Sequence, residues 1–234
     1  MPLQTVEPKR LYRQIAEQLR TLIAKGEFAT GARLPAERDL ARQLGVSRPS
    51  VREALIALEV EGRVEVRTGS GIYVLDRARR GSTVELTDWG PLELIRARRV
   101  IEGETAALAA VQGKRIDRDA IARAIDDMKA LADRAVVPLE ADRAFHIAIV
   151  QAGGNSVLIE TVQGFLDSRL GPLFQRLGGH FETAKAWRSA IAEHEAIYDA
   201  IAARDAQAAR AAMHEHMDKS HQRFSASWRR AHAP

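Results

Sequence analysis

Three short runs with helical spacing, within residues 10–61, constrain the fold of this chain more than any other feature. The runs cover residues 10–25, 36–44 and 48–61, and a glycine follows each of them. Only Gly45, Val46 and Ser47 separate the second run from the third, and Ser47 suits the N-cap position of a helix. Two helices joined by so short a link are typical of a helix-turn-helix.

A β-hairpin is predicted directly after the third helix. Val64 and Val66 alternate with charged residues, and residues 72–74 are β-prone. A glycine-rich turn, residues 68–71, separates the two segments. A hairpin in this place is a wing, so we predict an α+β winged helix-turn-helix domain over residues 1–76.

The rest of the chain is predicted to be helical, after a polar linker over residues 77–89. Alanine and leucine dominate there, and no strand pattern remains. The expected helices lie near residues 90–112, 117–134, 138–153, 155–177, 183–203 and 206–229. We therefore predict an all-α antiparallel helical bundle as a second domain over residues 90–230.

Charge is distributed unevenly between these two parts. Residues 1–80 contain 15 Lys and Arg against 10 Asp and Glu, a net charge of +5, whereas the remainder has a net charge of −1. A basic N-terminal third is expected of a module that meets a polyanion. An ordinary solvated surface explains the charge alone equally well.

Composition excludes several classes of protein. The chain contains no cysteine, so neither a disulfide framework nor a thiolate metal site is available. No apolar run approaches the roughly 20 residues that span a bilayer, and the first residues lack the apolar core of a signal peptide. We expect a soluble cytoplasmic protein with no membrane partner.

Short polar and basic side chains gather at the start of the third helix. Arg48 and Arg52 are four residues apart and so share one face. The N-terminal end of such a helix meets base edges in the major groove, where one arginine–guanine pair contributes about 1–3 kcal/mol of discrimination. Ser47 and Ser50 suit phosphate contacts. Each arginine alone also fits a solvated surface, but the combined pattern favours binding to double-stranded DNA.

Three further residues are candidates for the same interface. Arg38, on the second helix, could reach a base or the DNA backbone. Thr68 and Gly69, at the tip of the wing, could approach the minor groove or phosphates.

One carboxylate and three histidines form a candidate metal site. Asp142 and His146 lie at i and i+4 on one helix, and His194 and His216 lie on two later helices. One oxygen and three imidazole nitrogens suit Zn²⁺ or another divalent ion with open positions. Spacing alone leaves open that these histidines are ordinary surface or packing residues.

Residues 10–75 resemble the GntR family of bacterial regulators. The segments that carry the resemblance are residues 11–12, 31–38, 45–48, 51–55 and 69–71. The resemblance implies a homodimer on pseudo-palindromic operator DNA, with contacts from Arg38, Arg48 and Arg52 and assistance from Ser47, Ser50, Thr68 and Gly69. Pro49 departs from the family pattern, which often has a hydrogen-bond donor there.

Residues 92–224 resemble FCD, the helical ligand-binding domain of the FadR branch. The matching segments are residues 96–102, 142–146, 193–197 and 213–216. The resemblance implies that Asp142, His146, His194 and His216 hold a divalent metal ion, with zinc expected. It also implies that Arg98 lies beside an effector cavity, although a structural ion pair with a carboxylate of the bundle is an equal alternative.

Two segments, residues 10–14 and 59–74, are similar to regulators of hexuronate-utilisation operons. This similarity implies a repressor of sugar-acid catabolism that a small carboxylate effector releases from its operator. Two other functions stay open: a metal-responsive regulator and a metal-dependent hydrolase. We expect no enzyme, because no general base is evident: Glu193 and Glu195 flank His194 but point to other faces of its helix.

Overall fold

The computed structural model describes residues 10–67, 70–75, 89–169, 171, 174 and 183–231. The chain divides into two compact units. One is built mainly from the first 91 residues, and the other from Leu92–Leu170 and Gly178–Ser225.

Three helices form most of the N-terminal unit: α1 (Leu11–Ala24), α2 (Glu37–Leu44) and α3 (Arg48–Val60). α1 packs against α3, and Tyr12, Leu19 and Leu55 are buried between them. α2 ends at Gly45, whose φ of 64° lies in the left-handed region that glycine adopts without strain. The Ser47 side chain caps α3 by accepting a hydrogen bond from the Ser50 backbone N–H, as predicted.

The wing consists of two antiparallel strands, β1 (Val64–Arg67) and β2 (Gly71–Val74). Val64 lies opposite Val74, and Val66 lies opposite Ile72. Val64, Ile72 and Val74 are buried, so the hairpin is anchored by its apolar face. The prediction of a winged helix-turn-helix is confirmed. Thr68 and Gly69 lie outside the described residues.

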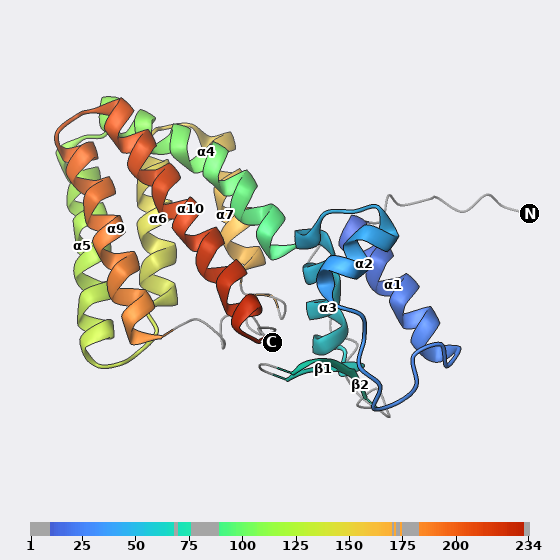
Figure 1. Cartoon of the computed structure of the whole chain (residues 1–234). Helices are drawn as coiled ribbons and strands as arrows, with labels where there is room; N and C mark the ends of the chain where they lie inside the picture. Colours follow the sequence, from blue (N-terminus) through green and yellow to red (C-terminus); the bar gives the residue numbers. More distant parts are fainter. Residues whose placement is uncertain are drawn as a thin grey trace, which may run out of the picture. The chain divides into compact units, whose positions relative to one another are not determined.

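The second unit is helical throughout its described part. Its helices are α4 (Pro91–Gln112), α5 (Arg115–Asp133), α6 (Leu139–Ala152), α7 (Ser156–Ser168), α9 (Ala184–Ala202) and α10 (Ala206–Ala231). α5 packs against both α6 and α9 (Figure 1). One core of buried aliphatic, alanine, phenylalanine and methionine side chains joins α4, α5, α6, α9 and α10. This confirms the predicted all-helical bundle.

One predicted helix runs past the end that the structure shows. The expected helix covers residues 155–177, whereas α7 ends at Ser168. Of residues 169–177, only Arg169, Gly171 and Phe174 lie within the described part of the chain. Gly171 and Pro172 follow in the sequence, and a residue before proline is driven out of the helical region while proline itself donates no backbone hydrogen bond. Of the predicted linker, residues 77–89, only Trp89 lies within the described residues.

The longest helices are not membrane spans. Across the described helices, no segment combines the length and the apolar composition needed to cross a bilayer.

Candidate metal centre, ligand pocket and DNA-binding face

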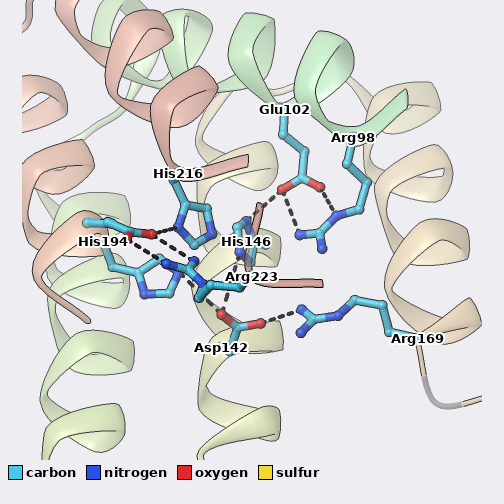
Figure 2. Close-up of polar contacts among 9 residues, drawn as sticks. Arg98, Glu102, Asp142, His146, Arg169, His194, His216 and Arg223 are labelled. Atoms are coloured by element: carbon cyan, nitrogen blue, oxygen red, sulfur yellow. Dashed lines mark hydrogen bonds and ion pairs between the residues drawn. The ribbon is translucent and has the colours of Figure 1, made fainter. Parts of the chain in front are cut away.

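The four predicted metal ligands come together inside the helical unit. α6 carries Asp142 and His146 one turn apart, α9 carries His194 and α10 carries His216. One ligand atom from each residue lies within 4.8 Å of the others, and all four side chains are buried. Figure 2 shows the three histidine rings and the Asp142 carboxylate facing one another.

The donor set fits a divalent transition metal. Both ring nitrogens of His194 and both ring nitrogens of His146 are buried and make no hydrogen bond among the described residues. Nδ1 of His146 lies within ion-pair distance of Glu102. Such orphaned nitrogens are costly unless a ligand satisfies them. Burial lowers the pKa of His194, and burial together with the neighbouring His194 lowers the pKa of His216 to about 3. Both rings are therefore neutral near pH 7, the form that binds a metal.

Asp142 faces the same centre and is ionised. Burial opposes its ionisation, but the charge of Arg169 and contacts with His146 and His194 outweigh burial and hold its pKa well below the usual range. Arg169 bonds Oδ2 of Asp142. The other oxygen, Oδ1, lies 3.2 Å from Nε2 of His194 and 3.7 Å from Nε2 of His146. One carboxylate oxygen thus faces the histidine nitrogens and could bind an ion between them.

A pocket adjoins the centre and shares two of its residues, Asp142 and His216. It encloses about 450 Å³, part of which is open to solvent. Three arginines line it, together with aromatic and small residues: Arg98, Arg169, Arg223, Trp187, Phe224, Ala186, Ala190 and Ser220. The buried indole Nε1 of Trp187 has no hydrogen-bond partner among the described residues. An anionic, hydroxyl-bearing ligand would complement these groups.

Arg98 both pairs with a carboxylate and lines this pocket. Its guanidinium pairs with Glu102, one turn along α4, and it also lines the pocket. Oε2 of Glu102 lies 2.6 Å from Nδ1 of His146. Burial opposes ionisation of Glu102, but Arg98 and His146 outweigh it and hold the pKa of this carboxyl far below its usual range.

A second carboxylate of this kind was not assigned a role from the sequence. Glu193 is buried, and its carboxylate accepts hydrogen bonds from Arg223 at 2.7 and 2.9 Å. Its Oε2 lies 2.9 Å from Nδ1 of His216. Arg223 lies seven residues, about two turns, after His216 on α10, so helical spacing could have placed both on one face.

On the N-terminal unit, the predicted DNA-contacting residues differ in how exposed their side chains are. The side chains of Arg38 and Arg48 are exposed, at 77% and 54%. Ser47 is exposed and Ser50 is half-buried. Ser47, Arg48 and Ser50 lie at the start of α3, where a helix meets the major groove, and Arg38 lies in the first turn of α2.

Arg52 is placed differently. It is buried and donates two hydrogen bonds, each 2.9 Å, to the carboxylate of Glu37 at the start of α2. Arg48 donates to the same carboxylate at 3.0 Å. Glu37 therefore joins α2 to α3 and holds the exposed Arg48 in place, with Arg52 as its buried partner.

Metal-free protein should lose stability as the pH falls below about 6.5. His216 has its folded pKa lowered to about 3, so between these values the unfolded chain binds a proton that the folded chain does not. Stability therefore rises with pH across this window, by about 1.4 kcal/mol per pH unit for one proton. Below pH 4.5 the lowered pKa of Glu193, about 2, acts in the same direction.

Denaturant unfolding at pH 5 and pH 6.5, with a chelator present, checks this. The stability difference between the two pH values should shrink in His216→Gln, because the variant has no imidazole to protonate. An unchanged difference would show that His216 is already protonated in the folded chain.

Comparisons with known proteins agree with this architecture. Residues 11–74 match the model of the bacterial regulatory proteins of the gntR family, and residues 93–219 match the FCD domain. The chain is 37% identical to the Uxu operon transcriptional regulator of Escherichia coli K12, over 92% of this chain and 87% of that one. It is 36% identical to the Exu regulon transcriptional regulator of the same organism, over 93% and 86%.

The fold is also shared with a solved structure, E. coli McbR/YncC. The TM-score is 0.53 at 22% identity, and the match covers 93% of this chain and 98% of the other. The curated relatives are transcription regulators, so the hydrolase hypothesis is set aside and the chain is not an enzyme. The chain belongs to the GntR family of bacterial regulatory proteins and is a DNA-binding transcription regulator with a C-terminal FCD domain.

Proposed function

We propose that this regulator is a repressor that a small sugar acid, a hexuronate or a near derivative, releases from its operator by binding beside a metal ion. One observation carries the proposal: a pocket lined by three arginines shares Asp142 and His216 with the candidate metal centre. Asp142, His146, His194 and His216 would hold the ion, with zinc as the expected metal. The ion would supply a Lewis-acidic point for ligand oxygens.

Charge favours an anionic ligand. Each pocket arginine is already paired with one carboxylate: Arg98 with Glu102, Arg169 with Asp142, and Arg223 with Glu193. These six charges cancel, and each of the three histidines is neutral when it binds an ion. A divalent ion therefore adds positive charge that the described side chains do not offset, and a carboxylate ligand would offset it.

Polar groups of the pocket favour a ligand with hydroxyls. The indole N–H of Trp187 has no partner among the described residues and would be satisfied by a ligand oxygen. Ser220 lines the same pocket. The relatives named as Uxu operon and Exu regulon regulators support hexuronates as the class to test first.

On DNA, we propose that a homodimer binds a pseudo-palindromic operator in the cytoplasm. Arg48 would read base edges, with Arg38, Ser47, Ser50 and the wing residues Thr68 and Gly69 at bases or phosphates. The exposed side chains at the start of α3 support this assignment. Arg52 would support the interface indirectly, by pairing with Glu37, which also contacts Arg48. Arg52 could bind DNA directly only if this buried ion pair broke.

Arg48→Ala and Arg52→Ala should therefore fail in different ways. Loss of Arg48 should weaken binding to a selected operator by about 1–3 kcal/mol, with a smaller loss on random DNA. Loss of Arg52 should lower the free energy of unfolding by about 3 kcal/mol, because it removes the buried partner of Glu37.

Operator and random-sequence titrations, with denaturant unfolding of both variants, separate the two effects. An equal loss on both DNAs for Arg48→Ala would show that Arg48 contacts only phosphates. If Arg52→Ala keeps its stability but loses operator specificity, then Arg52 reads bases directly.

A metal-responsive regulator is the second candidate. Its supporting observation is that all four residues of the Asp–His₃ set are buried. Binding or loss of an ion there would change the contacts among the helices that carry these residues. In that case metal alone would change operator affinity, without any acid.

A further inference from the structure

We infer that Glu102 and Glu193 are positioning residues of the metal centre, each fixing one metal-binding histidine and tying it to an arginine of the ligand pocket. The inference rests on the proposed metal site and adds two residues that do not touch the ion. Two chains of contacts carry it. The first is Arg98–Glu102–His146 (Figure 2), and the second is Arg223–Glu193–His216.

The first chain starts on α4. Glu102 is 1% exposed, and its carboxylate accepts a hydrogen bond from the guanidinium of Arg98, which lines the pocket. Its Oε2 lies 2.6 Å from Nδ1 of His146 on α6. The opposite nitrogen, Nε2, faces Asp142 across 3.7 Å. One carboxylate thus links a pocket arginine to the outer nitrogen of a histidine whose inner nitrogen faces the centre.

The second chain repeats this order on other helices. Glu193 on α9 is 7% exposed, and its carboxylate accepts two hydrogen bonds from Arg223, which also lines the pocket. Its Oε2 lies 2.9 Å from Nδ1 of His216 on α10. The two chains come from different helix pairs, so their common order is not a consequence of one local sequence pattern.

The chemistry of imidazole explains what such a carboxylate does. A neutral histidine carries one N–H and one lone pair, and the partner of the N–H decides which nitrogen keeps the lone pair. A carboxylate at Nδ1 accepts that N–H, leaves the lone pair on Nε2 and makes it a stronger donor. Glu102 and Glu193 therefore select the tautomer of His146 and His216 in which Nε2 can bind an ion.

The arginines hold these two carboxylates in place. Arg98 pairs with Glu102, and Arg223 pairs with Glu193, at hydrogen-bond distance. Each glutamate therefore contacts a pocket arginine with one part of its carboxylate and a metal-binding histidine with another.

Zinc affinity alone tests the inference on the full chain. Glu102→Ala and Glu193→Ala should each weaken Zn²⁺ binding by about 10- to 100-fold, measured by competition with a chromophoric chelator. Matched controls are Glu104→Ala, two residues along α4, and Glu195→Ala, two residues along α9. Both control side chains are exposed and paired with a surface cation, so they should bind Zn²⁺ as the unmodified chain does.

Glutamine variants separate positioning from general packing. The Oε1 of glutamine can still accept the Nδ1–H, so Glu102→Gln and Glu193→Gln should recover part of the lost affinity. The visible absorption spectrum of bound Co²⁺ should shift in the alanine variants and move back in the glutamine variants, because it reports the ligand geometry.

Failure of the inference is distinguishable from failure of the metal site. If the unmodified chain binds no Zn²⁺, the proposed metal centre is wrong, and this inference falls with it. If the unmodified chain binds Zn²⁺ and the Glu102 and Glu193 variants match their controls in affinity and in Co²⁺ spectrum, the centre stands and the positioning role is wrong.

Discussion

Replacing His194 by alanine should weaken Zn²⁺ binding by about a hundredfold or more. Protein sites with four ligands bind Zn²⁺ with roughly 10–16 kcal/mol at pH 7, so one ligand contributes on the order of 3 kcal/mol. His194 is fully buried, and neither of its ring nitrogens has a hydrogen-bond partner among the described residues. The nearest charged atom to its Nε2 is Oδ1 of Asp142 at 3.2 Å, which belongs to the same ligand set.

His214→Ala is the matched control. His214 lies two residues before His216 on α10, packs against Gly103 and is not part of the ligand set. Elemental analysis of chelator-free protein, followed by a Zn²⁺ titration, should give about one ion per chain for the unmodified protein and for His214→Ala. Equal metal content in His194→Ala would show that His194 is not a ligand.

The second large effect is expected on acid binding. Arg223→Ala should weaken glucuronate or galacturonate binding to zinc-loaded protein by roughly 10- to 150-fold, because a hydrogen bond to a charged group contributes about 1.5–3 kcal/mol. Arg98→Ala should have a similar effect, since both arginines line the pocket. Calorimetric titration with each sugar acid measures the loss.

Arg210→Ala controls for the loss of a positive charge on the same helix. Arg210 is a half-buried residue of α10 whose guanidinium donates two hydrogen bonds to the exposed Glu104, and it is not among the residues that line the pocket. Its variant should bind the acid normally. If Arg98→Ala and Arg223→Ala also bind the acid normally, the pocket is not the effector site.

Local signals in the sequence predicted the helices well because their ends are encoded locally. Ser47 caps α3, Gly45 ends α2, and the observed bounds of most helices differ from the predicted ones by only a residue or two. Apolar spacing continues past Ser168 and predicts a longer helix after Gly154, but α7 ends at Ser168, shortly before Gly171 and Pro172.

Contacts between helices far apart in sequence could not be predicted in the same way. The spacing of Arg48 and Arg52 correctly places them on one face of α3, but only the fold brings Glu37 against both and buries Arg52. Glu193 flanks His194 in the sequence, and both side chains contact His216 of α10. Periodicity along a single helix does not reveal this shared neighbour.

Operator affinity of the purified chain under four conditions tests the central claim most directly. The conditions are chelator, Zn²⁺ alone, a hexuronate alone, and both together. An effector with a coupling of about 1–3 kcal/mol weakens operator binding about five- to 150-fold, and we expect this loss only with Zn²⁺ and hexuronate together. A loss with Zn²⁺ alone, or one affinity under all four conditions, would contradict the account.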